Sequence, residues 1–362
     1  MELSGRYWLG AGLKSAVSLI AMSVVATARH FDGDDNVICS TNSVMILSDQ
    51  PTTWPWQEYA SFTATPPNLQ INTTGEPLSP GLIFFTPNGN SVKEGAPYIM
   101  TDGSDLVWAG PPTSDASNLR AQTLFGEPVL SYWQSTQTGP VNPLLGYGYG
   151  EVIILDASYT QIYNVCLQLN ITSTSSPCDA DLHESLITPY NTLLVTAYNV
   201  TTADLTSVGG PENGFVIDSL AVEIDIATGE IVFIWSPLEH VPINATHWPL
   251  QGAGSVESNP FDWFHMNSIQ LVDGYYLISS RNTWTIYLVD RLGDIIWQIN
   301  GEDGGDFGSL PAGASFVSLT QYGFLSRWKH ADSGLLPSTV LAALCTPYQS
   351  FVYRGCLAHV CK

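Results

Sequence analysis

The chain has 362 residues, of which 44% are hydrophobic and only 12% are charged, so it has enough apolar material for a large core and too little charge for a disordered chain. Its 33 acidic residues outnumber the 11 lysines and arginines, which gives a formal net charge of −22 at pH 7. A surface this acidic repels phosphate backbones and anionic lipid head groups, so we expect no nucleic-acid partner and no membrane-surface partner.

The first 28 residues have the organisation of a secretory signal peptide. Arg6 and Lys14 precede the apolar run of residues 15–26, and the small residues Ala-Thr-Ala occupy positions 26–28. We predict that residues 1–28 are removed and that the protein is secreted. The alternative is an uncleaved signal anchor, which would leave the protein attached to a membrane by its N-terminal segment.

Sequons and cysteines fit the same secretory route. Four Asn-X-Thr sequons predict a glycosylated surface, and they lie at Asn72, Asn170, Asn199 and Asn244. The chain has six cysteines, which suit an oxidising compartment. Cys166 and Cys178 bracket a Thr/Ser-rich stretch and are the predicted disulfide, whereas Cys39 has no obvious local partner.

The elements that follow are short strands. Prolines interrupt residues 29–80, so this N-terminal segment is expected to be irregular. From Gly81 onward, short runs rich in β-branched and aromatic residues alternate with turn signals, as in 152–155, 193–196 and 275–278. No window shows a long apolar stripe with a 3.6-residue period and helix caps. The sequence therefore predicts an all-β fold.

The strands also repeat as pairs. Each unit is a strand, a turn with Asp and Gly, and a second strand with an aromatic residue near its end. The turn aspartates are Asp102, Asp156, Asp225 and Asp290, at intervals of 54, 69 and 65 residues. A hairpin at this period is typical of a β-propeller blade. A β-sandwich with coincidental hairpins is the alternative.

The length of the repeating region limits the number of blades. We assign residues 81–334 to the propeller, and at about 60 residues per blade they supply four to five blades. The pattern is lost after His330, so residues 335–362 are expected to form an off-pattern tail. The sequence thus favours an open or incomplete ring in a truncated chain over a ring that is completed by unrecognised strands.

Three of the seven histidines stand in similar settings. His183 and His265 each open a strand that precedes a hairpin, and His330 follows at about the spacing of the next blade. In a propeller such a strand is the innermost of its blade, so its first residues face the axial channel. Arg281 ends the apolar strand 275–280, where it needs an anionic partner or solvent. The alternatives are hydrogen-bonded turn histidines and a three-histidine zinc site, which the nearby arginine disfavours.

Three histidines and an arginine around one channel suit an oxyanion that is being transferred. A neutral imidazole is a nucleophile toward sulfur or phosphorus, and an arginine fork matches two anionic oxygens. A protonated second histidine can donate its proton to the leaving oxygen. The Gly-Tyr repeat of 146–150, in contrast, has neither the lysine nor the following helix of a phosphate-binding loop, so we assign it no site.

The segments 181–184, 262–268, 276–281 and 328–330 resemble the arylsulfotransferase family, in its secreted fungal-type branch. The likeness runs from about residue 81 to residue 330, and the block 262–281 is its most specific part. The resemblance implies a β-propeller of the six-bladed type. It also implies transfer of a sulfuryl group from an aryl sulfate donor to a phenolic acceptor, with no nucleotide sulfate donor and no cofactor.

The resemblance assigns roles to individual residues. It implies that His330 is the nucleophile that becomes transiently sulfated. It further implies that the groups which bind the sulfuryl oxygens and assist the leaving phenol are His183, His265 and Arg281. Asn267 lies in the same specific block and is assigned to substrate binding, and Trp263 and Phe264 are candidates for stacking on the aryl ring.

Two departures from the family pattern define the alternatives. The family places Gln before the last histidine and Arg within a few residues after it, whereas this chain reads Lys-His-Ala-Asp at 329–332. Family members also continue with further blades beyond that histidine. The rival hypothesis is therefore a non-catalytic secreted propeller that acts as a binding or scaffold module. Hydrolysis, with water as the acceptor, is a third reading that the sequence does not separate from transfer.

Overall fold

The computed structural model describes residues 54–71, 81–89, 91–137, 146–169, 171, 176–300, 304–307, 351–352 and 356–357. The predicted signal peptide and His330 lie outside these residues, as does most of the predicted tail. In the part of the chain that the structure describes, the only helices are three-residue 3₁₀ turns, which confirms the all-β prediction. No helix of this part is long and apolar enough to cross a membrane.

The described strands are short and follow one another in antiparallel pairs. In chain order they are β1 (Ile83–Phe85), β2 (Tyr98–Met100), β3 (Leu106–Ala109), β4 (Ala116–Leu124), β5 (Glu127–Ser135), β6 (Gly150–Leu155), β7 (Gln161–Val165), β8 (Ala180–Ile187), β9 (Thr192–Ala203), β10 (Gly214–Asp225), β11 (Ile231–Trp235), β12 (Met266–Val272), β13 (Tyr275–Ser280), β14 (Thr285–Val289), β15 (Ile295–Asn300), β16 (Phe351–Val352) and β17 (Cys356–Leu357). The 3₁₀ turns are η1 (Thr206–Val208), η2 (Pro237–Glu239), η3 (Ile243–Ala245) and η4 (Gly305–Phe307).

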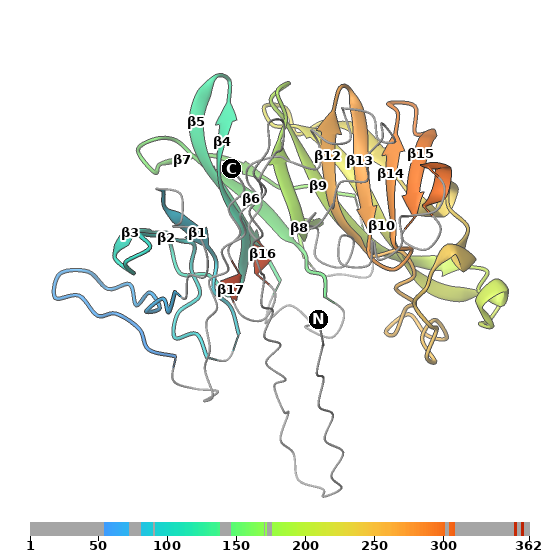
Figure 1. Cartoon of the computed structure of the whole chain (residues 1–362), viewed down its shortest axis with the longest axis horizontal. Helices are drawn as coiled ribbons and strands as arrows, with labels where there is room; N and C mark the ends of the chain where they lie inside the picture. The colour runs from blue at the N-terminus through green and yellow to red at the C-terminus, as the bar shows by residue number, and fades with distance from the viewer. Residues whose placement is uncertain are drawn as a thin grey trace, which may run out of the picture.

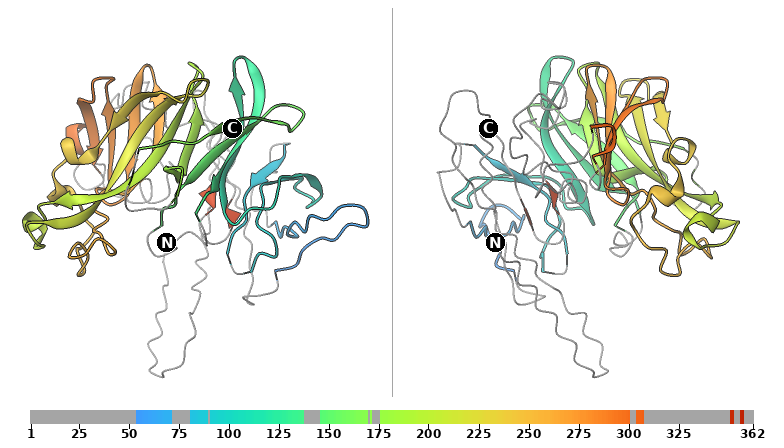
Figure 2. Two further views of the ribbon diagram at one scale, coloured as in Figure 1. Left: turned by 180° about the vertical axis from the view of Figure 1, so that it is seen from behind. Right: turned by 45° about the vertical axis from the view of Figure 1, so that its right-hand side comes forward.

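The strands form sheets of the kind that a propeller uses as blades. Strands β4 to β7, β8 to β11 and β12 to β15 make three consecutive four-stranded antiparallel units, and β1 to β3 make a three-stranded sheet. Strand pairing connects the first two units at one position, where Gly150 of β6 pairs with Ala180 of β8. The units lie side by side like the blades of a fan (Figures 1 and 2), and the described strands close no ring.

The repeated aspartates mark the last hairpin of each sheet. They lie at the end of the first strand of the hairpins β2–β3, β6–β7, β10–β11 and β14–β15 or within two residues after it, as the sequence period predicts. Asp156 shows their role, because its Oδ1 accepts hydrogen bonds from the backbone N–H groups of Ser158 and Thr160, at 2.8 and 3.0 Å. The carboxylate thereby stabilises the turn.

The first strand of each four-stranded unit is the inner one. Strand β8 packs against both β4 and β12, so the three inner strands meet at the centre of the described structure. Each inner strand has an irregular register near its start, between Ser117 and Arg120, between Ala180 and Ser185, and between Met266 and Ser268. A β-bulge redirects side chains and is frequent beside active sites. The described inner strands therefore share an irregular backbone near their starts.

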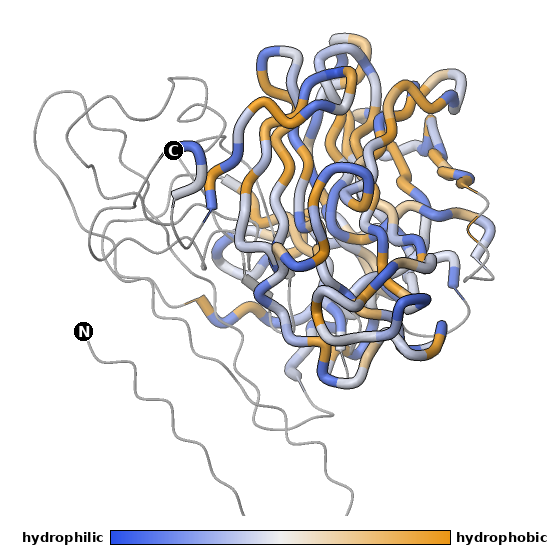
Figure 3. The backbone as a smooth tube through the Cα atoms, turned by 90° about the vertical axis from the view of Figure 1, so that its right-hand side faces the viewer, coloured by the Kyte–Doolittle hydropathy of each residue, from blue (hydrophilic) through white to orange (hydrophobic). Residues whose placement is uncertain are grey.

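Aromatic residues fill the spaces between neighbouring sheets. Trp133 packs between the first and second units, where its indole Nε1 donates to the carbonyl oxygen of Ala180 at 2.9 Å. Trp235 packs between the second and third units, and its Nε1 donates to the carbonyl oxygen of Gly293 at 3.0 Å. Apolar residues follow the strands and hydrophilic ones gather at the turns (Figure 3). The packing that holds neighbouring sheets together also fixes the inner strands.

The structure confirms the predicted disulfide, Cys166–Cys178, whose Cα atoms are 5.0 Å apart and whose sulfurs link the end of β7 to the segment before β8. Of the sequons, Asn244 is exposed in η3 and Asn199 is partly buried in β9. Asn72 and Asn170 lie outside the described residues. Of the two described sequons, Asn244 therefore gives an attached glycan the clearer access to solvent.

A substitution at Gly150 tests how tightly the first two units pack where they meet. A Cβ atom there would overlap the carbonyl oxygen of Gln134 and lie 2.6 Å from the ring of Trp133. We expect Gly150→Ala to lower the free energy of unfolding by about 3 kcal/mol, as overpacking of a tight core does. Urea unfolding of the variant measures this loss. Gly103→Ala is the matched control, because its nearest neighbour would be 3.5 Å away, and equal midpoints for the two variants would contradict the prediction.

Candidate active site

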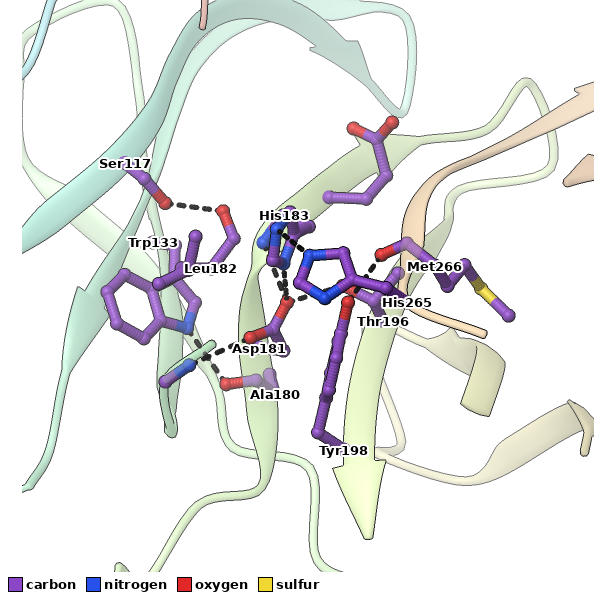
Figure 4. Close-up of polar contacts among 12 residues, drawn as sticks. Ser117, Trp133, Ala180, Asp181, Leu182, His183, Thr196, Tyr198, His265 and Met266 are labelled. Carbon is purple, nitrogen blue, oxygen red and sulfur yellow. Dashed lines mark hydrogen bonds and ion pairs between the residues drawn. The ribbon is translucent and has the colours of Figure 1, made fainter. Parts of the chain in front are cut away.

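Two histidines meet at the heads of β8 and β12. His183 lies in the bulge of β8, and His265 directly precedes β12. Their Nε2 atoms are 3.3 Å apart and their ring planes are nearly perpendicular, at 89° (Figure 4). His265 is fully buried and has a positive φ of 53°, a conformation that is uncommon for a residue with a side chain. Such backbone strain is frequent at functional sites.

A buried carboxylate fixes the orientation of His183. The Oδ2 atom of Asp181 lies 2.6 Å from Nδ1 of His183 and accepts hydrogen bonds from the backbone N–H of His183 at 2.9 Å and from the hydroxyl of Thr196 at 3.0 Å (Figure 4). Its Oδ1 accepts the backbone N–H of Gly148 at 2.9 Å. Since Oδ2 of Asp181 is a hydrogen-bond acceptor, Nδ1 of His183 carries the ring hydrogen. The other ring nitrogen, Nε2, faces His265.

A second carboxylate and an arginine flank His265. Oδ2 of Asp262 lies 2.5 Å from Nδ1 of His265, and Nη2 of Arg281 lies 3.0 Å from the same nitrogen and 3.7 Å from that oxygen. The backbone N–H of Arg281 donates to the carbonyl oxygen of His265 at 2.9 Å, which ties the end of β13 to the site. The side chains of Asp262 and Arg281 are 15% and 25% exposed, so this edge of the site reaches the surface.

Electrostatics keep His265 neutral at neutral pH. Burial is the main cause that lowers the pKa of His265, to about 4, because the charged imidazolium loses hydration. The carboxylate of Asp262 opposes this shift, whereas the positive charge of Arg281 adds to it, as does a proton on the neighbouring His183. A neutral imidazole retains a lone pair that can accept a proton or attack an electrophile.

Stacked aromatic rings form one wall of the site. Tyr198 stacks on His183 with centroids 5.6 Å apart and on Tyr147 with centroids 5.0 Å apart. Its hydroxyl donates to the carbonyl oxygen of Met266 at 2.7 Å (Figure 4), and burial raises its pKa well above the ordinary value, so it stays protonated. The Gly-Tyr repeat of 146–150, to which the sequence analysis assigned no site, thus contributes Tyr147 and the backbone N–H of Gly148 to the site.

The third inner strand adds a buried ion pair. Arg120 of β4 lies 2.7 Å from Oε1 of Glu184, with side chains 5% and 0% exposed. Burial raises the pKa of Glu184, and the charge of Arg120 opposes that rise. Asn118 accepts a hydrogen bond from Nη2 of Arg120 at 3.3 Å and donates to the carbonyl oxygen of Leu182 at 2.8 Å. The irregular starts of β4 and β8 are therefore tied together beside His183.

The structure brings three of the four predicted catalytic residues together, namely His183, His265 and Arg281. His330 lies outside the described residues. Asn267 is buried in β12, and its Oδ1 has no hydrogen-bond partner among the described residues, which suits a role in ligand binding.

The two aromatic residues assigned to substrate stacking lie in the core. Trp263 and Phe264 are fully buried, and the Phe264 ring packs against those of Trp235 and Tyr287 with centroids 6.0 and 5.7 Å apart. Neither residue offers an exposed ring face to an aryl group. Their structural role is to hold the segment before β12 against the third sheet.

Sequence reasoning missed the carboxylates that orient the two imidazoles. Asp181 stands two residues before His183, and Asp262 three residues before His265, so an aspartate shortly before each histidine was a usable signal. Tyr198 and Thr196 had no such signal, because they come from the neighbouring strand β9. Among the described residues, no group of three or more His, Cys, Asp and Glu side chains is arranged to hold a metal ion.

Comparison with known proteins adds one finding. The model of a protein family described as Arylsulfotransferase (ASST) matches residues 120–324. The matched segment runs from within β4 to beyond β15 and contains His183, His265 and Arg281, whereas His330 lies beyond its end. A search of curated proteins finds no match.

The low pKa of His265 predicts how stability depends on pH. The unfolded state, with an ordinary histidine pKa, binds more protons than the folded state between about pH 6.5 and 4. The free energy of unfolding should therefore fall as the pH drops through this window, by up to about 3 kcal/mol from His265. Urea unfolding at several pH values measures the effect.

The control for this measurement is the variant His265→Gln, which lacks the titrating group. It is needed because burial raises the pKa of Asp218 to about 6, and that group gains stability as the pH falls through the same window. The wild type should lose stability relative to His265→Gln as the pH falls. Parallel curves for the two proteins would contradict the assignment of His265 as a buried neutral histidine.

Proposed function

The chain belongs to the arylsulfotransferase (ASST) family, whose model matches more than half of its 362 residues, and we propose that it transfers a sulfuryl group from a phenolic sulfate ester to a phenol through a sulfated histidine. The observation that carries the proposal is the convergence of His183, His265 and Arg281 on one point, where two neighbouring sheets meet. A guanidinium binds the oxygens of an anionic group that is being transferred, and an imidazole supplies or accepts the proton that the transfer needs.

Arg281 is the proposed binding group for the sulfuryl oxygens. Its guanidinium is planar and permanently charged, and its partial exposure allows an anion to reach it. In a protein with a formal net charge of −22, a cation next to two imidazoles is a specific attraction for a small anion. Hydrogen bonds from this fork stabilise the negative charge that the three sulfuryl oxygens share during transfer. Oδ1 of Asn267, which has no hydrogen-bond partner among the described residues, is the proposed acceptor for the hydroxyl of the incoming phenol.

The proposed reaction has two steps, with His330 as the nucleophile. In the first step an imidazole lone pair attacks the sulfur, the bond from sulfur to the donor oxygen breaks, and the leaving phenolate takes a proton. In the second step the acceptor oxygen attacks the same sulfur, the nitrogen–sulfur bond breaks, and the acceptor gives up its proton. The imidazoles of His183 and His265 are the proposed groups that supply and receive these protons.

We also propose that the protein is a secreted glycoprotein. The apolar leader of residues 15–26, the four sequons and the Cys166–Cys178 disulfide support an oxidising secretory route. Retention of the leader as a membrane anchor remains the alternative form of this proposal.

The mechanism predicts a covalent adduct. Brief exposure of the folded protein to 4-nitrophenyl sulfate should raise its intact mass by one sulfuryl group, about 80 Da, with release of 4-nitrophenol. Addition of a phenol should then discharge the adduct and yield a new aryl sulfate. Mass spectrometry and absorbance measure the two products, and discharge by water alone would identify hydrolysis instead.

The variant His330→Ala is the control for this experiment, because it should form no adduct. An adduct that persists in His330→Ala would place the nucleophile elsewhere. A folded wild-type protein that binds the aryl sulfate but forms no adduct and releases no phenol would instead support the rival function, a non-catalytic binding module.

A further inference from the structure

We propose that Asp181 and Asp262 are positioning residues which make His183 and His265 a single proton-holding unit, in which one proton is shared between the two Nε2 atoms. The catalytic meaning of this unit rests on the proposed sulfuryl transfer, but its geometry does not. The proposal follows from counting the hydrogens that the contacts require.

The contacts of Asp181 determine which nitrogen of His183 carries its hydrogen. Three groups approach Oδ2 of Asp181, and two of them, the backbone N–H of His183 and the hydroxyl of Thr196, donate to it. The third is Nδ1 of His183, at 2.6 Å, which must also donate because the oxygen is an acceptor. A neutral imidazole has only one N–H, so Nε2 of His183 presents a lone pair.

The contacts of His265 lead to the same result. Two groups approach Nδ1 of His265: Oδ2 of Asp262 at 2.5 Å, which accepts a hydrogen, and Nη2 of Arg281 at 3.0 Å, which donates one. The shorter contact decides, because a carboxylate oxygen 2.5 Å from a nitrogen without a hydrogen would be repelled, so the hydrogen lies on Nδ1 and points to Asp262. With Nδ1 used in this way, Nε2 of His265 also presents a lone pair when the ring is neutral.

The two lone pairs face each other at hydrogen-bond distance. Two acceptors 3.3 Å apart gain an attractive contact only when one of them carries a proton. The pair is thus a site for one additional proton, held between two imidazoles whose other nitrogens are anchored on carboxylates. An isolated histidine would have no such partner for its Nε2–H.

The charges around the pair explain when this proton is bound. Among the described residues, the charged and titratable groups around it are Asp181, Asp262, Arg281, Glu184 with its partner Arg120, Tyr147 and Tyr198. Burial lowers the pKa of His265, so the resting pair releases its proton readily. A bound sulfate ester adds a negative charge beside Arg281, and that charge favours the protonated pair. Substrate binding thereby loads the proton that the leaving phenolate needs.

Over one reaction cycle the protons balance. The shared proton moves to the oxygen of the leaving phenolate when the bond from sulfur to that oxygen breaks. The acceptor phenol later loses its proton to the same pair, as its oxygen forms the new bond to sulfur. The unit ends the cycle with as many protons as it began, and no other reactant is consumed.

Asp181→Asn tests the positioning role directly. The amide of the variant carries no negative charge, and its nitrogen, when it takes the position of Oδ2, donates a hydrogen to Nδ1 of His183. We expect ¹⁵N NMR of histidine-labelled protein to show Nδ1–H for His183 in the wild type and a larger fraction of Nε2–H in the variant. This readout requires no turnover. An Nε2–H form of His183 in the wild type would overturn the proposal.

A kinetic comparison tests the catalytic meaning of the unit. A proton donor matters more for a basic phenolate, so Asp181→Asn should slow single-turnover release of phenol from phenyl sulfate by about 100-fold or more. Release from 4-nitrophenyl sulfate, whose phenolate leaves readily, should slow by less than about tenfold. Equal losses on both substrates would reduce Asp181 to a structural residue. Asp262→Asn should slow release from phenyl sulfate more than release from 4-nitrophenyl sulfate in the same way. Because the Asp262 side chain is 15% exposed, this substitution should disturb folding less than Asp181→Asn.

Asp179→Asn is the matched control for both experiments. Asp179 directly precedes β8 and is buried, as Asp181 within β8 is, but its carboxylate accepts the backbone N–H of Leu169 at 2.6 Å and contacts no histidine in the described structure. The control should change neither the NMR signals of His183 nor the ratio of rates for the two substrates. If the wild type turns over neither substrate, the proposed function fails, while the NMR comparison still decides whether Asp181 positions His183.

Discussion

The contact between Nε2 of His183 and Nε2 of His265 is the interaction on which the site depends. It forms only because β8 and β12, the inner strands of neighbouring sheets, lie side by side at the centre of the described structure. Each imidazole approaches this point with its other nitrogen held by a carboxylate, Asp181 on one side and Asp262 on the other. A shift of either strand by one residue would turn its histidine to the opposite face.

The rest of the fold keeps these strands in place. Indole donors cross between sheets, aromatic rings fill the space between them, and the turn aspartates stabilise the outer hairpins. The irregular backbone is confined to the starts of β4, β8 and β12, where it redirects polar side chains toward the centre. A regular outer frame thus supports an irregular inner edge, and the chemistry of the site resides on that edge.

The sequence predicted the frame well because the hairpin period, with Asp156 and its counterparts, is a local pattern. A resemblance to known sequences also pointed to His183, His265 and Arg281, which the structure brings together. The assignment of Trp263 and Phe264 to substrate stacking does not fit their burial in the core. The sequence beside a histidine does not show whether an aromatic ring faces a channel or the core. Sequence reasoning missed Arg120 and Tyr198 because their neighbours in space are set by strand pairing and irregular register, which no local spacing encodes.

The most direct test of this account is a crystal structure of the protein with a bound aryl sulfonate, which resembles an aryl sulfate but cannot be transferred. The account predicts that the sulfonate oxygens lie within about 3.2 Å of the Arg281 guanidinium and of an Nε2 atom of the histidine pair. It also predicts that both aspartates keep their contacts with Nδ1 of His183 and His265. A sulfonate that binds away from these side chains, with the histidine pair unchanged, would contradict the claim that this pair is the centre of the reaction.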